Sequence, residues 1–546
     1  MTNKGFRRIM ALALASTMVV GSAVPALAKK KEEANNQEQE NVSQEETTGE
    51  EATGEEATGE ETTGTKIKDT ELSMFIDFTW FGFDEWGTDA ISKEITKRTG
   101  VSFDVTRSTG SDNLPLLIAG GDLPDIVYAS NSDHCAALSD PDVCWTYDEL
   151  LEMYPDVDLG ISDEMRTYNE TLASDGKLYC VRNAVLPSDY EGEKMASGGD
   201  YYLTYRKDIL DELGLEEPTN MDEFEAVLMK VKEAYPDMLP LCWRDGYEGF
   251  IANQMGYSGW QGLDYKNGKE SGEMALWIET EGMKDVYATF NRFARNGLIN
   301  AETTTYDMEQ TYEFMKSGKG FACMTAGDSG IIFQDSADEA GEDQTWRIME
   351  EPFTTYESYG GISGWAGFFI TKNCKDPETA LRFLAYMRSE EGRRLGSWGI
   401  EGLDWEFDEN GNFTWTDRYY AGESEAIGVW IFGDQGEEKL RIDKAGMEKA
   451  DEIEKENFYA LLNWGNAQEV YPELSFVKPQ AGTDLRVKYD ALMDAMGSLE
   501  AKVMFAESEE AFEKAWTDMI DQANAYGMQE INEYATQIVA DYRANN

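Results

Sequence analysis

The sequence predicts an α/β protein of two or three packed units, with β-hairpins inserted among its strands and helices. Its 546 residues are too many for a single hydrophobic core. Short apolar runs of strand length alternate along the chain with segments of helical periodicity. Several Asx-Gly turn signals stand between such segments. Hydrophobic residues make up 41% of the chain, which is enough to fill normal globular interiors.

The first 28 residues have the pattern of a secretory signal. Lys4, Arg7 and Arg8 form a positive start, and an apolar run from residue 9 to 24 follows it. The run is short for a membrane span, and Ala26-Leu27-Ala28 fits a cleavage site. We expect cleavage after Ala28, with an uncleaved anchor as the alternative. No cysteine that could carry a lipid follows the apolar run, because the first cysteine is Cys135. We therefore expect an exported protein that is secreted or associated with the cell surface.

Residues 29–66 have the composition of an acidic, disordered linker. Residues 45–64 are four copies of Glu-Glu-(Thr/Ala)-Thr-Gly, without a large apolar side chain. Repulsion between the carboxylates extends such a segment. It serves either as a spacer or as an inert tail.

The folded part opens with a strand, a helix and a second strand. Residues 73–78 are apolar enough for a buried strand, and residues 101–105 alternate in the manner of a strand. Between them, residues 89–100 predict a helix with Ile91 and Ile95 on one face and Gly100 as its stop signal.

Residues 118–131, IAGGDLPDIVYASN, predict a tight turn, a short buried strand at residues 126–128 and a polar loop. Ser130 and Asn131 follow the strand directly. In open α/β sheets, ligands bind at the carboxyl ends of the strands. This loop is therefore a candidate binding element.

Three further helical regions carry strong local signals. Asn220 is expected to cap a helix, with Glu223 completing a capping box and four apolar residues repeating at helical spacing (Phe224, Val227, Leu228 and Val231). Asp376 and Pro377 begin another helix that turns Leu381 and Leu384 inward. Residues 487–543 form long helical stretches.

Three turn signals each predict a tight hairpin between short strands: residues 175–177, 267–269 and 410–412. The last of them, with Asp408 and Glu409 before it, has too few ligands at alternating spacing for an EF-hand loop. The hairpin is therefore the better interpretation.

The residue inventory restricts the possible chemistry. His134 is the only histidine in the chain, so any histidine-dependent triad must use it, and a histidine-rich zinc site is excluded. The sequence has neither a phosphate-binding loop nor a dinucleotide-binding glycine pattern. We expect no cofactor. If the six cysteines form a disulfide, Cys135 with Cys144 is the expected pair, but we expect free thiols.

The formal net charge of −59 argues against nucleic acid and anionic membranes as partners. It also disfavours polyanionic ligands, unless a local basic pocket exists. On charge alone, a neutral glycan is favoured.

Tryptophans in glycine-rich, loop-like segments are the feature of the sequence that favours ligand binding. The chain has 14 Trp and 27 Tyr. A tryptophan beside glycine and polar residues can offer a flat face to a sugar ring, while nearby Asp, Asn and Arg bond the hydroxyls. For each single tryptophan, core packing is an equal alternative. The aromatic residues in such text are Trp80, Phe83, Trp243, Trp260, Trp365 and Trp398.

Four segments in the same order resemble the extracellular solute-binding proteins of ABC importers, in particular their large, oligosaccharide-binding branch. The segments are LPLLIAGGDLPDIVY at residues 114–128, YYLTYRKDILDELGLEEPTNMDEFEAVLMKVKEAYPD at 201–237, FARNGLINAETTTYDMEQTYEFMKSGKGFACMTAG at 293–327 and ETALRFLAYMRSEEGRRLGSWGIEGLDWEFDENGNF at 378–413. The resemblance spans about residues 70 to 415. One departure is the missing lipidated cysteine after the signal, so release by signal peptidase, or retention by an uncleaved signal, must replace lipidation.

The resemblance implies a two-lobed, periplasmic-binding-protein-like α/β fold of type II, with a hinge and a central ligand cleft. The first lobe is expected at residues 67–190 and 326–390, and the second at 191–325 and 391–546. The residues that the resemblance brings to the cleft are Trp80, Phe83, Ser130, Asn131, Tyr202, Arg206, Trp243, Asp328, Trp365 and Trp398. Asp245 and Trp260, from the loop-like segments that carry tryptophan, complete the expected ligand-binding set. Arg206 has a structural alternative, which is pairing with Asp208.

The expected function is the sugar-capturing subunit of an ABC importer. A monomer would hold an oligosaccharide in an aromatic-lined cleft and deliver it to permease subunits, without catalysis. The main alternative is a secreted glycoside hydrolase or lyase, which needs only two carboxylates. A surface adhesion protein is a weaker alternative, because the only clear repeat lies in the linker.

Overall fold

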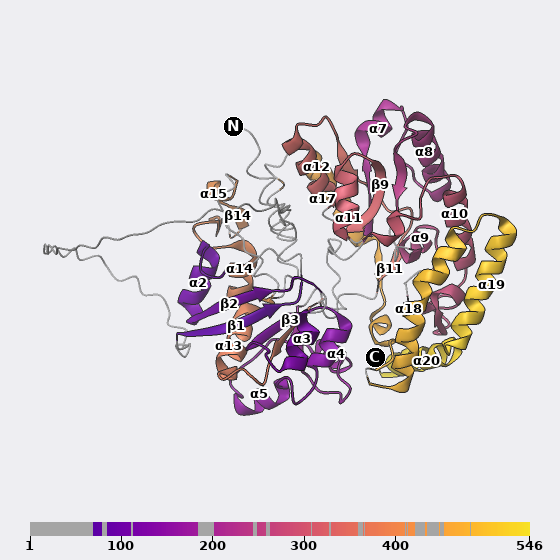
Figure 1. Ribbon diagram of the computed structural model, residues 1–546. Coiled ribbons are helices and arrows are strands. Elements are labelled where there is room, and N and C mark those ends of the chain that lie inside the picture. The colour runs from indigo at the N-terminus through magenta and orange to yellow at the C-terminus, as the bar shows by residue number, and fades with distance from the viewer. Residues whose placement is uncertain are drawn as a thin grey trace, which may run out of the picture.

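The structure is a computed structural model, and it describes residues 69–78, 85–110, 113–183, 201–243, 248–257, 262–306, 308–326, 329–358, 364, 366–409, 411, 413–420, 432–433, 447, 452–480 and 482–545. The expected signal and linker lie outside these residues. Within them, the chain folds into two lobes, each built around its own sheet (Figure 1).

The first lobe comprises the described residues of 69–183 and 364–433. Its first part contains β1 (Thr70–Ile76), α2 (Ala90–Thr99), β2 (Val101–Arg107), α3 (Asn113–Gly120), β3 (Ile126–Ala129), α4 (Ser132–Leu138), α5 (Tyr147–Met153), α6 (Asp163–Glu170) and β4 (Cys180–Arg182). Its second part contains β12 (Gly367–Ile370), α13 (Pro377–Arg388), α14 (Glu390–Trp398), β13 (Trp405–Phe407), β14 (Phe413–Trp415) and α15 (Asp417–Tyr420).

The sheet of the first lobe has the strand order β2-β1-β3-β12-β4. β1 runs parallel to β2 and to β3, while β12 runs antiparallel to both β3 and β4. β4 therefore runs in the same direction as β3, and the carboxyl ends of β1, β3 and β4 share one edge of the sheet. We call this edge the carboxyl edge.

The second lobe comprises the described residues of 201–358 and 452–545. It begins with β5 (Tyr201–Arg206), α7 (Lys207–Glu212), α8 (Met221–Ala234), β6 (Leu239–Cys242), α9 (Glu248–Gln254), β7 (Leu263–Tyr265), β8 (Met274–Leu276), η1 (Trp277–Glu279), α10 (Met283–Arg295), η2 (Thr303–Thr305), α11 (Met308–Lys316), β9 (Gly320–Ala326), α12 (Ser329–Ala340), β10 (Trp346–Ile348) and β11 (Tyr356–Ser358). It ends with α17 (Glu452–Asn466), β15 (Gln468–Val470), η4 (Pro472–Phe476), α18 (Asp484–Met504), α19 (Glu509–Ala525) and α20 (Met528–Asn545).

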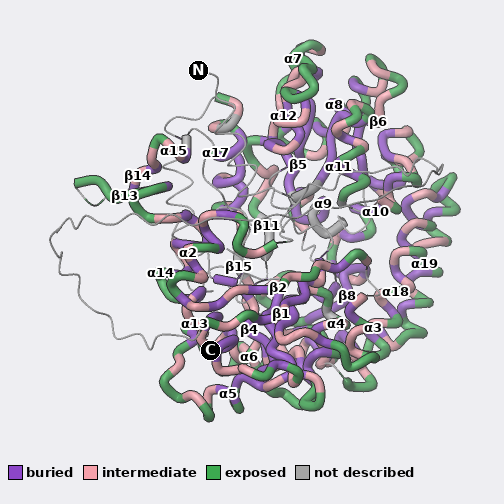
Figure 2. The backbone as a smooth tube through the Cα atoms, turned by 60° about the vertical axis from the view of Figure 1, so that its left-hand side comes forward, coloured by how far each residue is buried: buried purple, intermediate pink, exposed green. Residues whose placement is uncertain are grey.

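The sheet of the second lobe has the order β10-β5-β9-β6. Figure 1 shows α18, α19 and α20 along the outer side of this lobe, next to α10. Their apolar faces join the strands and α8 in one large core, whose buried side chains include Leu228, Trp277, Trp464, Leu492 and Ile531. In Figure 2 the strands of both sheets are largely buried, whereas the outer faces of these helices are exposed.

The chain passes between the lobes three times: between residues 183 and 201, 358 and 364, and 433 and 452. This differs from the expected boundaries at residues 326 and 390. After β9 the chain stays in the second lobe, because α12 packs there and Trp346 to Ile348 pair with β5. α14 stays in the first lobe, where Leu395 joins the core and Arg98 bonds Glu391 at 2.8 Å.

The expected local signals for the first helix and for α13 are confirmed. Asp89 caps α2 through the backbone N–H of Ser92, and Gly100 ends it in the left-handed conformation at φ 74°. Asp376 caps α13, and Pro377 is its first residue.

Two local expectations need correction. Asn220 caps α8, but the Glu223 carboxylate accepts hydrogen bonds from Thr219 instead of from Asn220 N–H. Hairpins occur between β7 and β8 and between β13 and β14, as expected. The hairpin expected at residues 175–177 is wrong: Gly176 turns the chain between helix α6 and strand β4.

Candidate functional site

The carboxyl edge of the first sheet is the place where polar side chains from distant parts of the chain meet. Asp77 follows β1, Ser130 and Asn131 follow β3, and Arg182 ends β4. The parallel direction of these three strands brings the four residues to one edge. Ligand sites of open α/β sheets form at such an edge.

Asp77 and His134 form a close pair at this edge. The Asp77 backbone N–H donates to the Tyr128 carbonyl at 2.9 Å, which fixes Asp77 beside β3. Its carboxylate Oδ2 lies 2.6 Å from Nδ1 of His134. The Asp77 side chain is only 2% exposed, and its burial raises the pKa of the carboxyl while the His134 contact opposes the rise. This contact with a buried carboxyl group therefore fixes the orientation of the His134 side chain, the only histidine of the chain.

Asn131 has a structural task in addition to its expected position. Its Oδ1 accepts hydrogen bonds from the backbone N–H groups of Asp133 and His134, so it caps α4. The side-chain amide nitrogen of the exposed Asn131 still offers a donor to solvent or ligand. Ser130 is partly buried beside it.

The second lobe contacts the first through residues 476–486, from the end of η4 into the first turn of α18. Gln480 Nε2 donates to the Ala173 carbonyl of the first lobe at 3.2 Å. Nη2 of Arg486 lies 4.0 Å from an Asp133 carboxylate oxygen, and its Nε bonds Asp490 at 2.7 Å. The rings of Phe476 and Tyr168 are 6.0 Å apart. The two lobes are therefore in direct contact here.

Lys478 is the exposed cation of this contact region. Its Nζ lies 5.6 Å from the centre of the Tyr489 ring. Among the described residues, no carboxylate lies within 4 Å of that nitrogen. Partial burial of the Lys478 ammonium and the nearby Arg486 guanidinium lower the pKa of that group, while Asp490 and Asp133 raise it.

Two of the expected binding aromatics lie in the core of the second lobe. Trp243 is fully buried, and its ring centre lies 4.3 Å from that of Phe290. Tyr202 is fully buried against Trp464, with ring centres 5.5 Å apart. Both belong to the same apolar cluster. Neither ring face is open to a ligand in this structure: Trp243 follows its packing alternative, and the expected role of Tyr202 at the ligand is replaced by core packing.

Trp398 belongs to an aromatic cluster under the β13–β14 hairpin. It packs edge-on against Trp405 and Phe413 at 4.9 and 5.1 Å between ring centres, and Arg394 lies over its ring. It is 4% exposed, so its packing is structural as well.

Arg206 forms the structural pair that was its alternative. Its Nε and Nη2 bond the two carboxylate oxygens of Asp208 at 2.8 and 2.5 Å, and its guanidinium lies over the Trp346 ring. Asp208 also accepts from the Thr345 backbone N–H. The pair thereby ties β5 to β10.

Six expected site residues lie outside the described residues: Trp80, Phe83, Asp245, Trp260, Asp328 and Trp365. Their neighbours do have defined positions. Gly364, next to Trp365, packs so closely on Asn183 that an added Cβ would lie 1.7 Å from the Asn183 carbonyl oxygen. Asn183 and Ala366 exchange two hydrogen bonds of 3.0 Å there. A glycine is required at residue 364 for this contact between the two parts of the first lobe.

Sequence reasoning missed Asp77, Arg182, Lys478 and Arg486. Asp77 directly follows the first predicted strand, so the rule that selected Ser130 and Asn131 would also have selected Asp77. No local signal marks Lys478 or Arg486, because more than 340 residues separate them from Asp133 along the chain.

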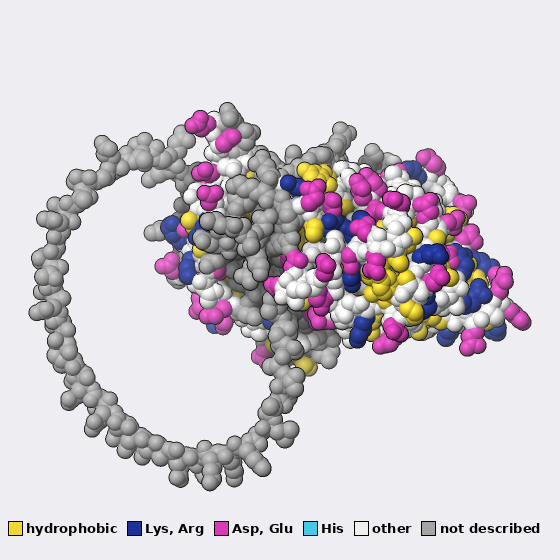
Figure 3. Space-filling view, turned by 90° about the horizontal axis from the view of Figure 1, so that it is seen from above, with side chains coloured by type: hydrophobic (Ala, Val, Ile, Leu, Met, Phe, Trp, Pro, Cys, Tyr) yellow, Lys and Arg dark blue, Asp and Glu magenta, His cyan; other side chains and the backbone are white. Residues whose placement is uncertain are grey.

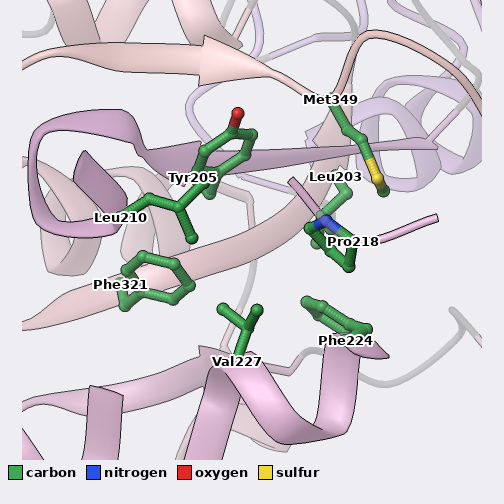
Figure 4. Close-up of a pocket in the computed structure, with 8 residues that line it drawn as sticks. All are labelled: Leu203, Tyr205, Leu210, Pro218, Phe224, Val227, Phe321 and Met349. Carbon is green, nitrogen blue, oxygen red and sulfur yellow. The ribbon is translucent and has the colours of Figure 1, made fainter. Parts of the chain in front are cut away.

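Two cavities lie away from the carboxyl edge. One, of about 10 Å³, is enclosed by apolar side chains of the second lobe. Figure 4 shows the Tyr205 hydroxyl pointing away from this cavity, and that hydroxyl donates a hydrogen bond to Glu217. The cavity has room for about one water but no polar lining. The other is an open depression of about 760 Å³ at the opposite edge of the first sheet, lined by residues such as Glu71, Asp125 and Lys375.

The described residues lack disulfides, metal-binding clusters and helices suited to crossing a membrane. All six cysteines are buried free thiols, so Cys135 and Cys144 are not joined. Within the described ranges, no group of three or more His, Cys, Asp or Glu side chains is arranged to hold a metal ion. No helix in those ranges is long and apolar enough to cross a membrane. In Figure 3, Asp and Glu side chains are spread over the described surface, with Lys and Arg among them.

Comparison with known proteins places these observations in a family. The family model of the bacterial extracellular solute-binding proteins matches residues 85–394, more than half of the chain. The polygalacturonan/rhamnogalacturonan-binding protein YtcQ of Bacillus subtilis is 23% identical over 346 residues, which cover 60% of this chain. The match spans 65% of YtcQ, slightly less than two thirds of its length.

Solved structures share the fold. The calcium-free alginate-binding protein AlgQ2 superposes with a TM-score of 0.61 at 16% identity, covering 88% of this chain and all of that chain. The N-glycan transport solute-binding protein NgtS of Streptococcus pneumoniae gives a TM-score of 0.55 at 16% identity, covering 87% of this chain and 99% of its own. At these identities the likeness establishes the two-lobed α/β fold that the sequence predicts.

Proposed function

This chain belongs to the bacterial extracellular solute-binding proteins, and from that premise we propose that it captures an oligosaccharide between its lobes and delivers it to the permease of an ABC importer. The ligand would contact the carboxyl edge of the first sheet. Closure of the lobes around it would create the form that docks on the permease.

The observation that carries the proposal is the meeting of both lobes at one polar edge. Asp77, Asn131 and His134 supply hydrogen-bonding groups from the first lobe. From the second lobe, Arg486 approaches Asp133 on α4, which follows this edge, and Gln480 contacts Ala173 of the first lobe. Hydroxyl-rich ligands need convergent donors and acceptors of this kind.

The names of similar proteins support a carbohydrate as the solute. YtcQ is a polygalacturonan/rhamnogalacturonan-binding protein, AlgQ2 an alginate-binding protein and NgtS an N-glycan transport protein. In the proposed site, sugar rings would stack on aromatic residues that flank the strands, with Trp80, Phe83, Trp260 and Trp365 as the candidates. Asp245 and Asp328 would bond hydroxyl groups there.

The proposal includes the expected mode of action. The protein would be exported through its first 28 residues, act as a monomer outside the membrane, and release the sugar unchanged. The acidic repeats at residues 45–64 would hold the lobes away from the cell surface.

Thermal unfolding against a panel of neutral and acidic oligosaccharides, with product analysis for every ligand that stabilises the protein, tests this function. A ligand at 100 times its dissociation constant stabilises the folded state by about 2.7 kcal/mol. The proposal predicts a rise in Tm with an intact sugar. A rise accompanied by shortened or unsaturated sugar would show a hydrolase or lyase instead. An unchanged Tm across the whole panel would contradict a carbohydrate ligand.

A further inference from the structure

The last turn of the C-terminal helix reaches from the second lobe to the first. Tyr542 of α20 stacks on Phe476 of η4, with 5.5 Å between the ring centres and 28° between the ring planes. Its hydroxyl lies 3.4 Å from a carboxylate oxygen of Glu164 on α6, in the first lobe. In Figure 2 the C-terminal end of the chain lies beside α6 and β4. The end of the chain is therefore part of the contact between the lobes.

On the first lobe, α6 brings two of its residues to this contact. Glu164 and Tyr168 are four positions apart, so they lie on the same face of the helix. The Tyr168 ring meets the Phe476 ring edge-on, with 6.0 Å between the ring centres. The Tyr168 hydroxyl accepts a hydrogen bond of 3.4 Å from Nη1 of Arg182, the last residue of β4. Tyr168, Phe476 and Tyr542 thus form a row of three rings across the boundary, which we call the aromatic row.

On the second lobe, α20 is attached at several points along its length. The side chains of Asn532 and Thr536, one turn apart, accept hydrogen bonds of 2.8 and 2.9 Å from two backbone N–H groups of β8. In the last turn, Nη2 and Nε of Arg543 bond the Glu473 carboxylate of η4 at 3.0 and 3.1 Å. Because α20 is bonded to both β8 and η4, the ring of Tyr542 keeps a fixed position on the second lobe.

The aromatic row lies next to two of the places where the chain crosses between the lobes. Arg182, which bonds Tyr168, is followed after residue 183 by the first crossing. η4 begins two residues after β15, and β15 pairs with β11, the last strand before the second crossing. Points close to the axis of a hinge move little when the hinge turns. A contact beside the crossings can therefore persist while more distant parts of the lobes approach or separate.

The kind of contact also suits rotation. Ring pairs tolerate a range of angles, and their apolar contact is not directional, whereas a hydrogen bond weakens steeply with angle. The polar contacts across this part of the boundary are single or long: 3.4 Å for Tyr542 with Glu164 and 3.2 Å for Gln480 with the Ala173 carbonyl. The rings are therefore the groups that can hold the lobes together throughout a hinge motion.

We propose that the aromatic row is the pivot of the protein: it stays in contact as the lobes open and close, and it confines their motion to one rotation about the crossings. The last turn of α20 is part of this pivot. The inference goes beyond the proposed function, because it concerns how the lobes move and holds for any solute.

Pulsed electron paramagnetic resonance without ligand tests the pivot. Spin labels at Lys97→Cys on α2 and Lys230→Cys on α8 report on the two lobes, since these side chains are 75% and 62% exposed and the native thiols are buried. In this labelled protein the rings are removed by Tyr168→Ala, by Phe476→Ala and by both together.

Two tyrosine variants complete the set. Tyr542→Phe keeps the ring in the row and removes only the hydroxyl. Tyr526→Ala is the matched control: this ring lies at the turn between α19 and α20, is 39% exposed, and has no ring or hydrogen-bond partner for its side chain within the described part of the chain. Tyr168 and Phe476 are only partly buried, so the variants should fold, which far-UV circular dichroism and Tm check.

The pivot predicts a wider spread of distances between the lobes around an unchanged mean. Each lost ring pair should raise the share of molecules outside the main peak by about 2- to 10-fold, the range that an aromatic pair contributes. The double variant should resemble Phe476→Ala alone, because the partner of Tyr168 is already missing there. Tyr542→Phe and Tyr526→Ala should match the unsubstituted labelled protein.

Three results would overturn the pivot. A distribution that Tyr168→Ala and Phe476→Ala leave unchanged would show that the rings do not restrain the lobes. A narrow peak at a new mean would show a latch that holds one end state. Effects that multiply in the double variant would show that the two rings act separately. A failed pivot leaves the proposed function intact, and a thermal panel without a stabilising sugar leaves the pivot intact, because the distances are measured without ligand.

Discussion

Replacing Gly364 by alanine tests whether the crossing into the first lobe is as tightly packed as the structure has it. An added Cβ would lie 1.7 Å from the Asn183 carbonyl oxygen and 2.2 Å from its side-chain Oδ1. Real Cβ atoms essentially never come closer than 3.0 Å to such an atom, so the backbone at residue 364 or 183 must retreat by roughly 1.3 Å.

That retreat has a cost that follows from the local contacts. Asn183 N–H donates to the Ala366 carbonyl, and Ala366 N–H donates to Asn183 Oδ1, each at 3.0 Å. Losing both hydrogen bonds removes about 1–3 kcal/mol. Overpacking of the surrounding strands adds about 1–3 kcal/mol. Gly364→Ala should therefore lower the free energy of unfolding of the first lobe by about 2–6 kcal/mol.

Equilibrium unfolding in guanidinium chloride, followed by tryptophan fluorescence and far-UV circular dichroism, measures this loss. Gly110→Ala is the matched control, because an added Cβ there meets no atom within 4 Å. The control should stay within about 0.5 kcal/mol of the wild type. If Gly364→Ala unfolded together with Gly110→Ala, the close approach of residues 183 and 364 would be refuted.

Four other predictions follow from the described contacts. Trp243→Ala should destabilise the second lobe by about 3–5 kcal/mol, because it empties a fully buried site, and it should weaken ligand binding only in proportion to the unfolded fraction; a large loss of affinity at unchanged stability would place Trp243 at the ligand instead. Reductant should leave Tm unchanged, because all six cysteines are free thiols. Ellman's reagent should label the six thiols only after denaturation, because all are buried and burial raises the pKa of Cys135 to about 11. Fewer than six labelled thiols in the denatured, unreduced protein would reveal a disulfide. Burial raises the pKa of Asp77, so its contribution to stability is present below the unfolded pKa of about 3.9 and is lost as the pH rises through the folded pKa. Denaturant unfolding at a series of pH values should therefore show the wild type losing stability relative to Asp77→Asn as the pH rises from about 4 to about 7. A constant difference in stability between the two proteins would contradict the raised pKa. Arg206→Lys should lower the unfolding free energy by about 1–3 kcal/mol, because lysine cannot reproduce the two-point bond to Asp208; equal stability would show that the pair does not hold β10 to β5.

Features of the fold that depend on neighbouring residues were predictable from the sequence. Asp89 and Gly100 bound α2, and Asp376 begins α13, because a cap is made within three residues of its helix. The strand at residues 126–129 was likewise marked by its apolar run between turn signals. Resemblance to a family then supplied the two-lobed arrangement, which periodicity alone does not give.

Features that depend on distant residues were not predictable. The hairpin expected at residues 175–177 fails because the turn that Gly176 makes is compatible with a helix before it as well as with a strand. The second crossing between the lobes follows residue 358 and not the expected residue 326, because Trp346 to Ile348 pair with β5, some 140 residues earlier. The local sequence around a tryptophan in a glycine-rich segment does not show whether its side chain is exposed or buried. The packing against Phe290 is what shows that Trp243 lies in the core.

The candidate site shows the same division. Ser130 and Asn131 were found from their place after a strand, although the capping role of Asn131 was not. The Asp77–His134 pair joins residues 57 positions apart, and the approach of Arg486 to Asp133 joins residues from different lobes. Such pairs arise from topology, so no local pattern marks them.

The distance between the lobes, measured with and without ligand, tests the central claim of capture by closure most directly. Spin labels at Lys97→Cys on α2 and Lys230→Cys on α8 would report on the first and second lobes, because both side chains are exposed and the native thiols are buried. Pulsed electron paramagnetic resonance gives the distance distribution with and without the oligosaccharide that raises Tm most. We predict a shift to shorter distances with that sugar and none with a sugar that leaves Tm unchanged. An identical distribution at saturating ligand would contradict closure of the lobes around a captured solute.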